Sequence, residues 1–164
     1  MSQHSVDTLL EITREIMEKA AFCFLMTGGP PGAISARLMQ PYAPEDDLVV
    51  HFGASGNSRK AQELQRDGRA TVAYQLAEEG AYVALLGQAT VETALALRQR
   101  YWRESFTAFW PEGPEEGDYA VLRFVPARIE VMHMERGVAP EPFGLRPAVL
   151  VKEDGAWRVS EDYP

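Results

Sequence analysis

Short apolar segments separated by turn-forming residues constrain the fold of this chain more than any other feature. The turn signals are the Gly-Gly-Pro-Pro-Gly run at 28–32, the stretch at 44–47 and the Glu-Glu-Gly run at 78–80. Between them lie runs rich in β-branched and aromatic residues, a composition typical of strands joined by tight turns. We therefore expect strands over 22–28, 33–42, 48–55, 69–77, 81–93 and 119–134, and a final hairpin over 147–160.

Three segments have helical patterns instead. A cap at 5–7, followed by apolar residues at three-to-four spacing, predicts a helix that ends near Ala21. A short helix is expected over 58–67 and a third helix over 95–110. Strands with short turns and helices inserted between them predict a mainly β, α+β fold. We expect an antiparallel barrel with helices packed around it rather than a doubly wound parallel sheet.

Composition limits the partners of the chain. Its 164 residues, 46% of them hydrophobic, suffice for one domain with a substantial core. An excess of 24 acidic over 16 basic residues disfavours binding to nucleic acid or to an anionic membrane. Cys23 is the only cysteine, which excludes an internal disulfide and suits a reducing compartment. The apolar run at 20–26 is too short to span a bilayer and the N-terminus does not resemble a secretory signal, so we expect a cytoplasmic protein.

Positive charge has an unusual distribution in the first half of the chain. Arg37 is the only charged residue between Lys19 and Glu45. In the stretch from 48 to 62, the only charged residues are Arg59 and Lys60. An unpaired arginine inside a strand is costly if it is buried, so Arg37 should meet either a distant carboxylate or an anionic ligand. The absence of acids nearby in the sequence favours the ligand.

The segment at 53–60 has the features of a phosphate site at the start of a helix. Ser58, Arg59 and Lys60 would occupy the first turn, where free backbone N–H groups and the helix dipole attract an anion. The small residues at 53–56 would let the backbone approach a ligand closely. Neither a Walker loop nor a GxGxxG motif is present. The alternative is that Arg59 and Lys60 are solvated helix charges and that Arg37 lies on an edge strand.

Four segments in order resemble the pyridoxamine 5′-phosphate oxidase-like superfamily, specifically its general stress protein branch. They are ISARLMQ, HFGASGNSRKAQEL, AYVALLGQATV and YWRESFTAFWPEGPEEGDYAVLRFVPARIEVM, and the similarity covers roughly residues 6–134. The resemblance implies a split β-barrel that forms a homodimer, with a flavin mononucleotide (FMN) in each of two sites at the interface. FAD is the alternative cofactor. We assign residues 1–134 to this FMN-binding domain and 135–164, which do not match, to a C-terminal extension of the same domain.

The resemblance also implies where the flavin would lie. Arg37 matches the arginine that reaches the flavin phosphate, and residues 58–60 match a second phosphate-binding segment. Strand residues 38–40 match the backbone along the isoalloxazine ring. The flavin-binding candidates are Arg37, Leu38, Met39, Gln40, Phe52, Gly53, Ala54, Ser55, Ser58, Arg59, Lys60, Tyr82 and Trp110.

This sequence departs from the family pattern at some of these positions. The residues at 52–54 fall where the family often has an aromatic or apolar residue and then a threonine, so a hydroxyl contact is missing or shifts to Ser55. Tyr82 stands where the oxidases have a flavin-contacting glutamine from the partner subunit. Trp110, in the Phe-Trp-Pro-Glu-Gly run, is a candidate wall of the site, although aromatics spaced as at 102–110 more often pack in a core.

These observations favour a homodimeric FMN-binding protein, an FMN-dependent oxidoreductase of the general stress protein type. No protein acid or base for the reaction can be assigned. His4, His51 and His133 are scattered without close ligand partners, so no metal site is expected. One alternative is a flavin carrier or stress sensor without turnover, and another is a deazaflavin- or haem-binding relative on the same barrel.

Overall fold

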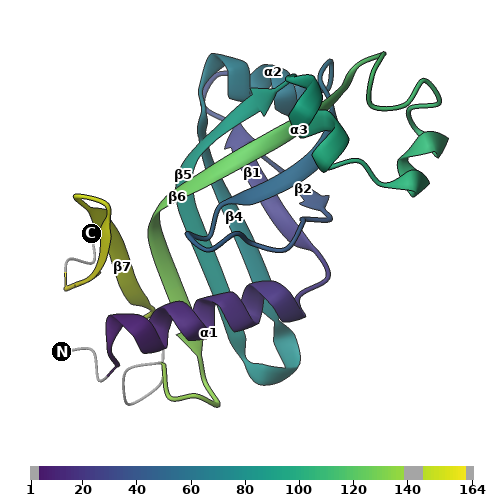
Figure 1. Ribbon diagram of the computed structural model, residues 1–164. Helices are drawn as coiled ribbons and strands as arrows, with labels where there is room; N and C mark the ends of the chain where they lie inside the picture. The colour runs from purple at the N-terminus through teal and green to yellow at the C-terminus, as the bar shows by residue number, and fades with distance from the viewer. Residues whose placement is uncertain (1–3, 139–145, 162–164) are drawn as a thin grey trace.

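An antiparallel sheet of eight strands curls into a partly open barrel in a computed structural model, which describes residues 4–138 and 146–161 (Figure 1). The strands are β1 (Cys23–Gly28), β2 (Ile34–Met39), β3 (Val50–Ser55), β4 (Arg69–Leu76), β5 (Ala81–Glu92), β6 (Tyr119–His133), β7 (Ala148–Glu153) and β8 (Ala156–Ser160). The helices are α1 (Val6–Lys19), α2 (Arg59–Arg66) and α3 (Leu95–Arg100), with 3-10 turns η1 (Ala77–Glu79) and η2 (Glu104–Ala108). The predicted antiparallel, mainly β architecture with helices around it is confirmed.

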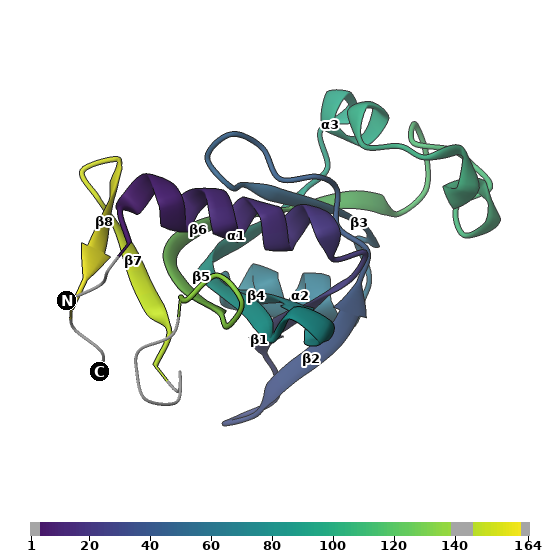
Figure 2. The same ribbon diagram turned by 90° about the horizontal axis from the view of Figure 1, so that it is seen from below.

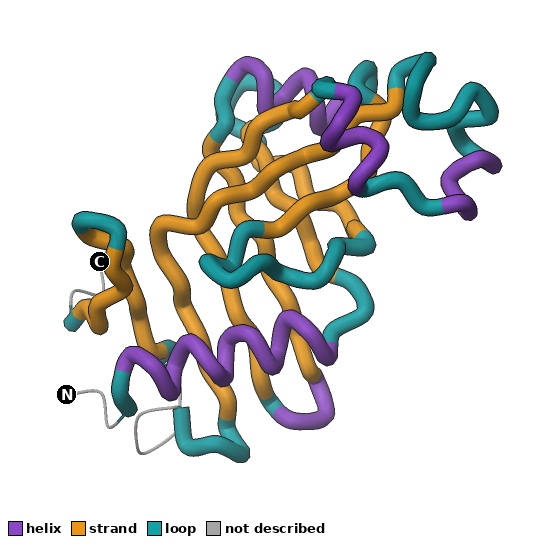
Figure 3. The backbone as a smooth tube through the Cα atoms, viewed as in Figure 1, coloured by secondary structure: helices purple, strands orange, loops and turns teal. Residues whose placement is uncertain are grey.

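The long strand β6 organises the sheet. The strand order is β2-β1-β4-β5-β6-β7-β8, and β3 joins separately by pairing with β6 (Figure 3). One edge of β6 pairs with β5 along most of its length, whereas the other pairs with β3 over 119–124 and with β7 over 128–131. The sheet therefore divides where β6 exchanges one neighbour for another.

Pro126 lies at that division, beside an irregularity in the pairing of β5 with β6. The register between β5 and β6 shifts after Leu86, so that Gly87 faces Pro126 and Ala127 has no partner on β5. A proline has no backbone N–H for a sheet ladder, and a bulge bends the strand. Pro126 thus marks the bend between the two halves of β6.

Helix α1 crosses one end of the barrel, and α2 lies at the other (Figure 1). The Ser5 hydroxyl caps α1 by accepting a hydrogen bond of 3.2 Å from the backbone N–H of Thr8. Leu9, Ile12 and Ile16 on its apolar face are buried in the main core, which confirms the predicted amphipathic helix. Among the described residues, no helix is both long and apolar enough to span a membrane.

The prediction of a single helix over 95–110 is wrong, because α3 ends at Arg100 and the chain continues as the 3-10 turn η2. The carbonyl of Tyr101 accepts hydrogen bonds from the hydroxyls of Tyr42 and Tyr119, the latter at 2.5 Å. Trp102 and Phe106 then pack edge-on against each other, and Trp102 packs against Tyr119. These contacts with distant residues override local helix propensity. Figure 2 shows the segment after α3 standing away from the barrel.

The C-terminal hairpin has the predicted form and extends the sheet. β7 pairs with β6, β8 pairs with β7, and the turn between them contains Asp154 and Gly155. Val149 and Leu150 are buried, and Leu150 belongs to the main core. The hairpin therefore shares the hydrophobic core of the barrel.

Gly87→Ala tests the bend in β6. A Cβ on Gly87 would lie 2.0 Å from the carbonyl oxygen of Val125, so the strands must separate, and we expect a loss of about 3 kcal/mol in the free energy of unfolding. In the control, Gly28→Ala, the nearest atom would be 3.8 Å away, and we expect a change of no more than about 0.5 kcal/mol. Urea unfolding of both variants measures the difference, and equal stabilities would contradict this account of the bulge.

Candidate functional site

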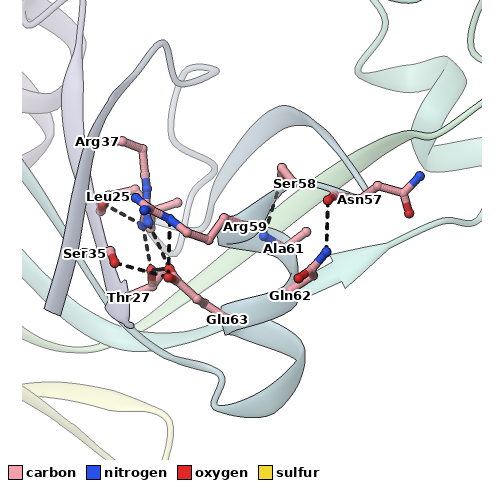
Figure 4. Close-up of polar contacts among 10 residues, drawn as sticks. All are labelled: Leu25, Thr27, Ser35, Arg37, Asn57, Ser58, Arg59, Ala61, Gln62 and Glu63. Carbon is pink, nitrogen blue, oxygen red and sulfur yellow. Dashed lines mark hydrogen bonds and ion pairs between the residues drawn. The ribbon is translucent and has the colours of Figure 1, made fainter. Parts of the chain in front are cut away.

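A buried glutamate, Glu63, lies at the centre of a polar cluster between α2 and the first two strands (Figure 4). Arg37 on β2 donates from Nη2 to Glu63 Oε2 at 2.9 Å. Its Nη1 donates to Thr27 Oγ1 at 2.6 Å and to the carbonyl of Leu25 at 3.2 Å. The cluster therefore joins α2 to both β1 and β2.

The Glu63 carboxylate is fully enclosed and well supplied with donors. It accepts hydrogen bonds from Thr27 Oγ1 at 2.5 Å and from Ser35 Oγ at 3.1 Å, in addition to the bond from Arg37. Burial alone would raise the pKa of Glu63, but the hydrogen bonds from Thr27, Arg37 and Ser35 outweigh it and hold the pKa below its ordinary value. Glu63 is therefore ionised at neutral pH.

Lys60 adds a second cation beside Arg37, and the part of the chain that the structure describes supplies no counter-ion for it. Its side chain is half-buried, and burial first, then the charge of Arg37, lowers the pKa of the ammonium group. Over the described ranges, 4–138 and 146–161, no carboxylate lies within ion-pair distance of Lys60. A half-buried positive charge in this position is unfavourable unless an anion joins it.

The start of α2 lies within the same cluster. Ser58 is the N-cap, and its hydroxyl accepts from Ala61 N at 3.4 Å and donates to the Ser55 carbonyl at 2.6 Å. Arg59 is largely exposed, with Nε 3.5 Å from Glu63 Oε1 one turn further along. The structure thus brings together the predicted group of Arg37, Ser58, Arg59 and Lys60.

Glu63 is the residue that sequence reasoning missed. Arg37 was expected to meet either a distant carboxylate or an anionic ligand, and the structure shows a carboxylate, because Glu63 lies just beyond the acid-free stretch and pairs with Arg37 across the fold. A signal was available in the sequence: Glu63 is three residues after Lys60 and four after Arg59, and residues at these spacings share a helix face. It is also adjacent to the apolar Leu64, on the side of α2 that is buried.

Leu38 on β2 and Tyr82 on β5 lie on the opposite, open face of the sheet, whereas Met39 lies on the Arg37 side. Side chains alternate along β2, so that Leu38 points away from the Arg37 side and is 58% exposed. Met39 is half-buried and packs against the core, and Gln40 follows the strand and is exposed. Tyr82 on β5 is half-buried and pairs in register with Gln75 and Met132.

The candidate residues on β3 take part in packing within the fold. Phe52 and Ala54 are buried in the main core, so only their backbone can reach a ligand. A Cβ on Gly53 would lie 2.7 Å from the Phe106 ring, so the small residue here makes room for that aromatic side chain. Its expected role in close backbone approach to a ligand has no support in these contacts.

Ser55 and Trp110 meet at a separate carboxylate, Asp118. The Ser55 hydroxyl donates to Asp118 Oδ2, and Trp110 Nε1 donates to Asp118 Oδ1 at 3.0 Å. The bond from Ser55 first, then that from Trp110, lowers the pKa of Asp118 against the effect of burial. The Trp110 ring also packs on Tyr119 and Phe106, so it belongs to an aromatic cluster.

The family model described as "Pyridoxamine 5′-phosphate oxidase like" matches residues 8–139. The chain belongs to the pyridoxamine 5′-phosphate oxidase-like family. This confirms the family suggested by the resemblance in sequence. No curated protein matched the chain.

Solved structures with the same fold include other members or relatives of this family. A pyridoxamine 5′-phosphate oxidase-related, FMN-binding protein from Nostoc punctiforme superposes with a TM-score of 0.71 at 15% identity, covering 100% of both chains. A Clostridium acetobutylicum protein related to general stress protein 26 gives 0.69 at 16% identity, covering 79% of this chain and 91% of that one. General stress protein 26 from Bacillus anthracis gives 0.63 at 19% identity, with coverages of 74% and 91%. At these identities the likeness establishes the fold.

Thr27→Val tests whether the Glu63 cluster stabilises the fold. The hydroxyl of Thr27, which is 2% exposed, bridges Arg37 and Glu63, and its loss leaves a buried carboxylate with one donor fewer. We expect the free energy of unfolding to fall by about 2 kcal/mol. Thr71→Val, on the open face of β4, is the matched control and should change it by less than about 0.5 kcal/mol. Chemical denaturation measures both, and a neutral Thr27→Val would argue against a stabilising role.

Proposed function

We propose that this protein binds FMN as a homodimer and acts as an FMN-dependent oxidoreductase of the general stress protein type. The observation that carries the proposal is the half-buried Lys60 ammonium group, which lies beside Arg37 at the start of α2 without a carboxylate partner among the described residues. An anionic ligand would supply the missing negative charge. The match to the family and its FMN-binding relative from Nostoc support FMN as that ligand.

The charges of the cluster fit the flavin phosphate. Arg37, Arg59 and Lys60 carry three positive charges, and Glu63 carries one negative charge, so that two positive charges remain. A phosphate monoester carries about −1.5 to −2 at neutral pH, so it would be close to balanced in this site. Backbone N–H groups in the first turn of α2 would donate to the same phosphate.

A second copy of this chain is the proposed occupant of the open face of the sheet. On this face Phe24 on β1 is in register with Leu38 on β2, and the two side chains are 50% and 58% exposed. Ile34, at the other end of β2, is 79% exposed. Such a group of exposed apolar side chains indicates an interface, and the split-barrel resemblance points to a homodimer. Sedimentation velocity of the purified protein measures the oligomeric state directly.

In this proposal the residues of the chain bind and orient the cofactor. FMN, when bound, supplies hydride or electron transfer through its isoalloxazine ring. Arg37, Lys60 and the first turn of α2 hold the phosphate, and the backbone at 38–40 lies along the ring. Positive charge near the ring favours its anionic reduced form, and the partner subunit shields the ring from water. Tyr82 is placed on the open face, where the partner would approach it.

Removing one cation tests the phosphate site. We expect Arg37→Gln or Lys60→Gln to weaken FMN binding by about 1.5 to 3 kcal/mol, because each removes a charge-assisted contact with the phosphate. Riboflavin, which lacks the phosphate, should bind these variants and the unmodified protein equally. Arg66→Gln, at the last turn of the same helix, is the matched control and should bind FMN normally. Fluorescence titration measures all of these affinities, and full FMN affinity in both site variants would defeat the assignment.

Reduction kinetics separate an oxidoreductase from a flavin carrier. We expect NADH or NADPH to reduce the bound flavin faster than free FMN in stopped-flow absorbance, because the protein orients the ring and excludes water. Reduction no faster than that of free FMN would favour the carrier or stress sensor. The absorption spectrum of the purified protein is recorded first, because a Soret band would identify a haem-binding relative. A deazaflavin would differ from FMN in its absorption bands and in the mass of the released chromophore.

A further inference from the structure

The contacts of Arg37 and Glu63 divide the donors of the guanidinium into two sets. Two hydrogen bonds from Nη1 and one from Nη2 are made within the protein, to Leu25, Thr27 and Glu63. A guanidinium has five N–H donors, so two have no hydrogen-bond partner within 4–138 and 146–161 and are left for a ligand. The Arg37 side chain is 17% exposed and that of Glu63 is 0% exposed, so a ligand can reach the arginine but not the carboxylate.

We propose that Glu63 is a built-in counter-ion, which balances the cationic cluster when no phosphate is bound and limits how tightly the cluster holds one. This inference rests on the proposed FMN site and goes further, because it assigns the strength of phosphate binding to a residue that does not touch the ligand. Glu63 is a positioning and charge-setting residue, not a catalytic one.

The cluster needs such a counter-ion when the ligand is absent. Arg37, Arg59 and Lys60 gather at one end of α2, and only Glu63 supplies negative charge to them among the described residues. Removing the partner of a buried charge is strongly destabilising, because the remaining charge keeps its desolvation cost. Glu63 therefore allows the ligand-free protein to fold with Arg37 in place.

The same carboxylate opposes the ligand. Glu63 is held by Thr27, Ser35 and Arg37 and has no exposed surface, so it stays in place when a phosphate arrives. Its negative charge then lies behind Arg37 and repels the phosphate through a region of low dielectric constant. The cluster offers a net charge of two rather than three, which suits a ligand that binds reversibly.

Glu63→Gln separates the charge of Glu63 from its shape. Glutamine has nearly the same volume and can still accept a hydrogen bond from Arg37. Three results are expected together: a lower midpoint of thermal unfolding without ligand, an FMN dissociation constant lower by about fivefold or more, and a riboflavin dissociation constant within about twofold of the unmodified protein. Inorganic phosphate should raise the unfolding midpoint more in the variant than in the unmodified protein.

Glu18→Gln on α1, at the other end of the barrel, removes the same charge and should leave FMN affinity unchanged. FMN binding by Glu63→Gln that is equal to or weaker than that of the unmodified protein overturns the inference. Failure of the proposed function is distinguishable, since in that case the unmodified protein itself does not prefer FMN to riboflavin.

A double variant covers the case in which Glu63→Gln alone does not fold. In the Arg37→Gln background the buried cation is gone, so the second substitution leaves no unpaired charge in that place. The double variant should bind FMN more tightly than Arg37→Gln alone, because the repulsive carboxylate has been removed. Equal or weaker binding by the double variant overturns the inference.

Discussion

The ion pair between Arg37 and Glu63 is the interaction on which the candidate site depends. It joins β2 to α2, while Thr27 on β1 donates to the same carboxylate and accepts from the same guanidinium. A buried pair of this kind adds little net stability over apolar residues, but it fixes geometry because each partner needs the other. The start of α2, and with it Lys60, is thereby held at a defined place against the sheet.

Strand β6 connects the site to the rest of the barrel. Because β6 pairs with β3 in one half and with β7 in the other, the strand that leads into α2 and the C-terminal hairpin are both attached to one strand. The bend at Pro126 lets the two halves diverge. The open face of β1 and β2 lies on the other side of the strands from the Arg37 cluster, so the proposed phosphate site and the proposed subunit contact would use different faces of β2.

The sequence was sufficient to predict the features that depend on local pattern. Strands, turns and α1 follow from periodicity and turn residues, and even the irregularity at Pro126 has a local cause, the missing N–H. Features that depend on distant contacts were not predictable in this way. The break after α3 requires the hydroxyls of Tyr42 and Tyr119, which lie far away along the chain. The partner of Arg37 is a second such case, because Glu63 is 26 residues away along the chain and the pair forms across the fold.

The hydrogen bonds to the Tyr101 carbonyl have a practical consequence. Just beyond β2, Tyr42 donates to the Tyr101 carbonyl, and the Arg103 guanidinium lies 4.0 Å from the centre of the Tyr42 ring and donates to the Pro41 carbonyl. Trp102 lies in the sequence between Tyr101 and Arg103, which make these contacts. Trp110 packs on the same Tyr119 ring as Trp102. We therefore expect a displacement at the end of β2 to alter the surroundings of two of the three indole rings in the chain. Their contribution to the intrinsic tryptophan emission would then report events at that strand without an attached dye.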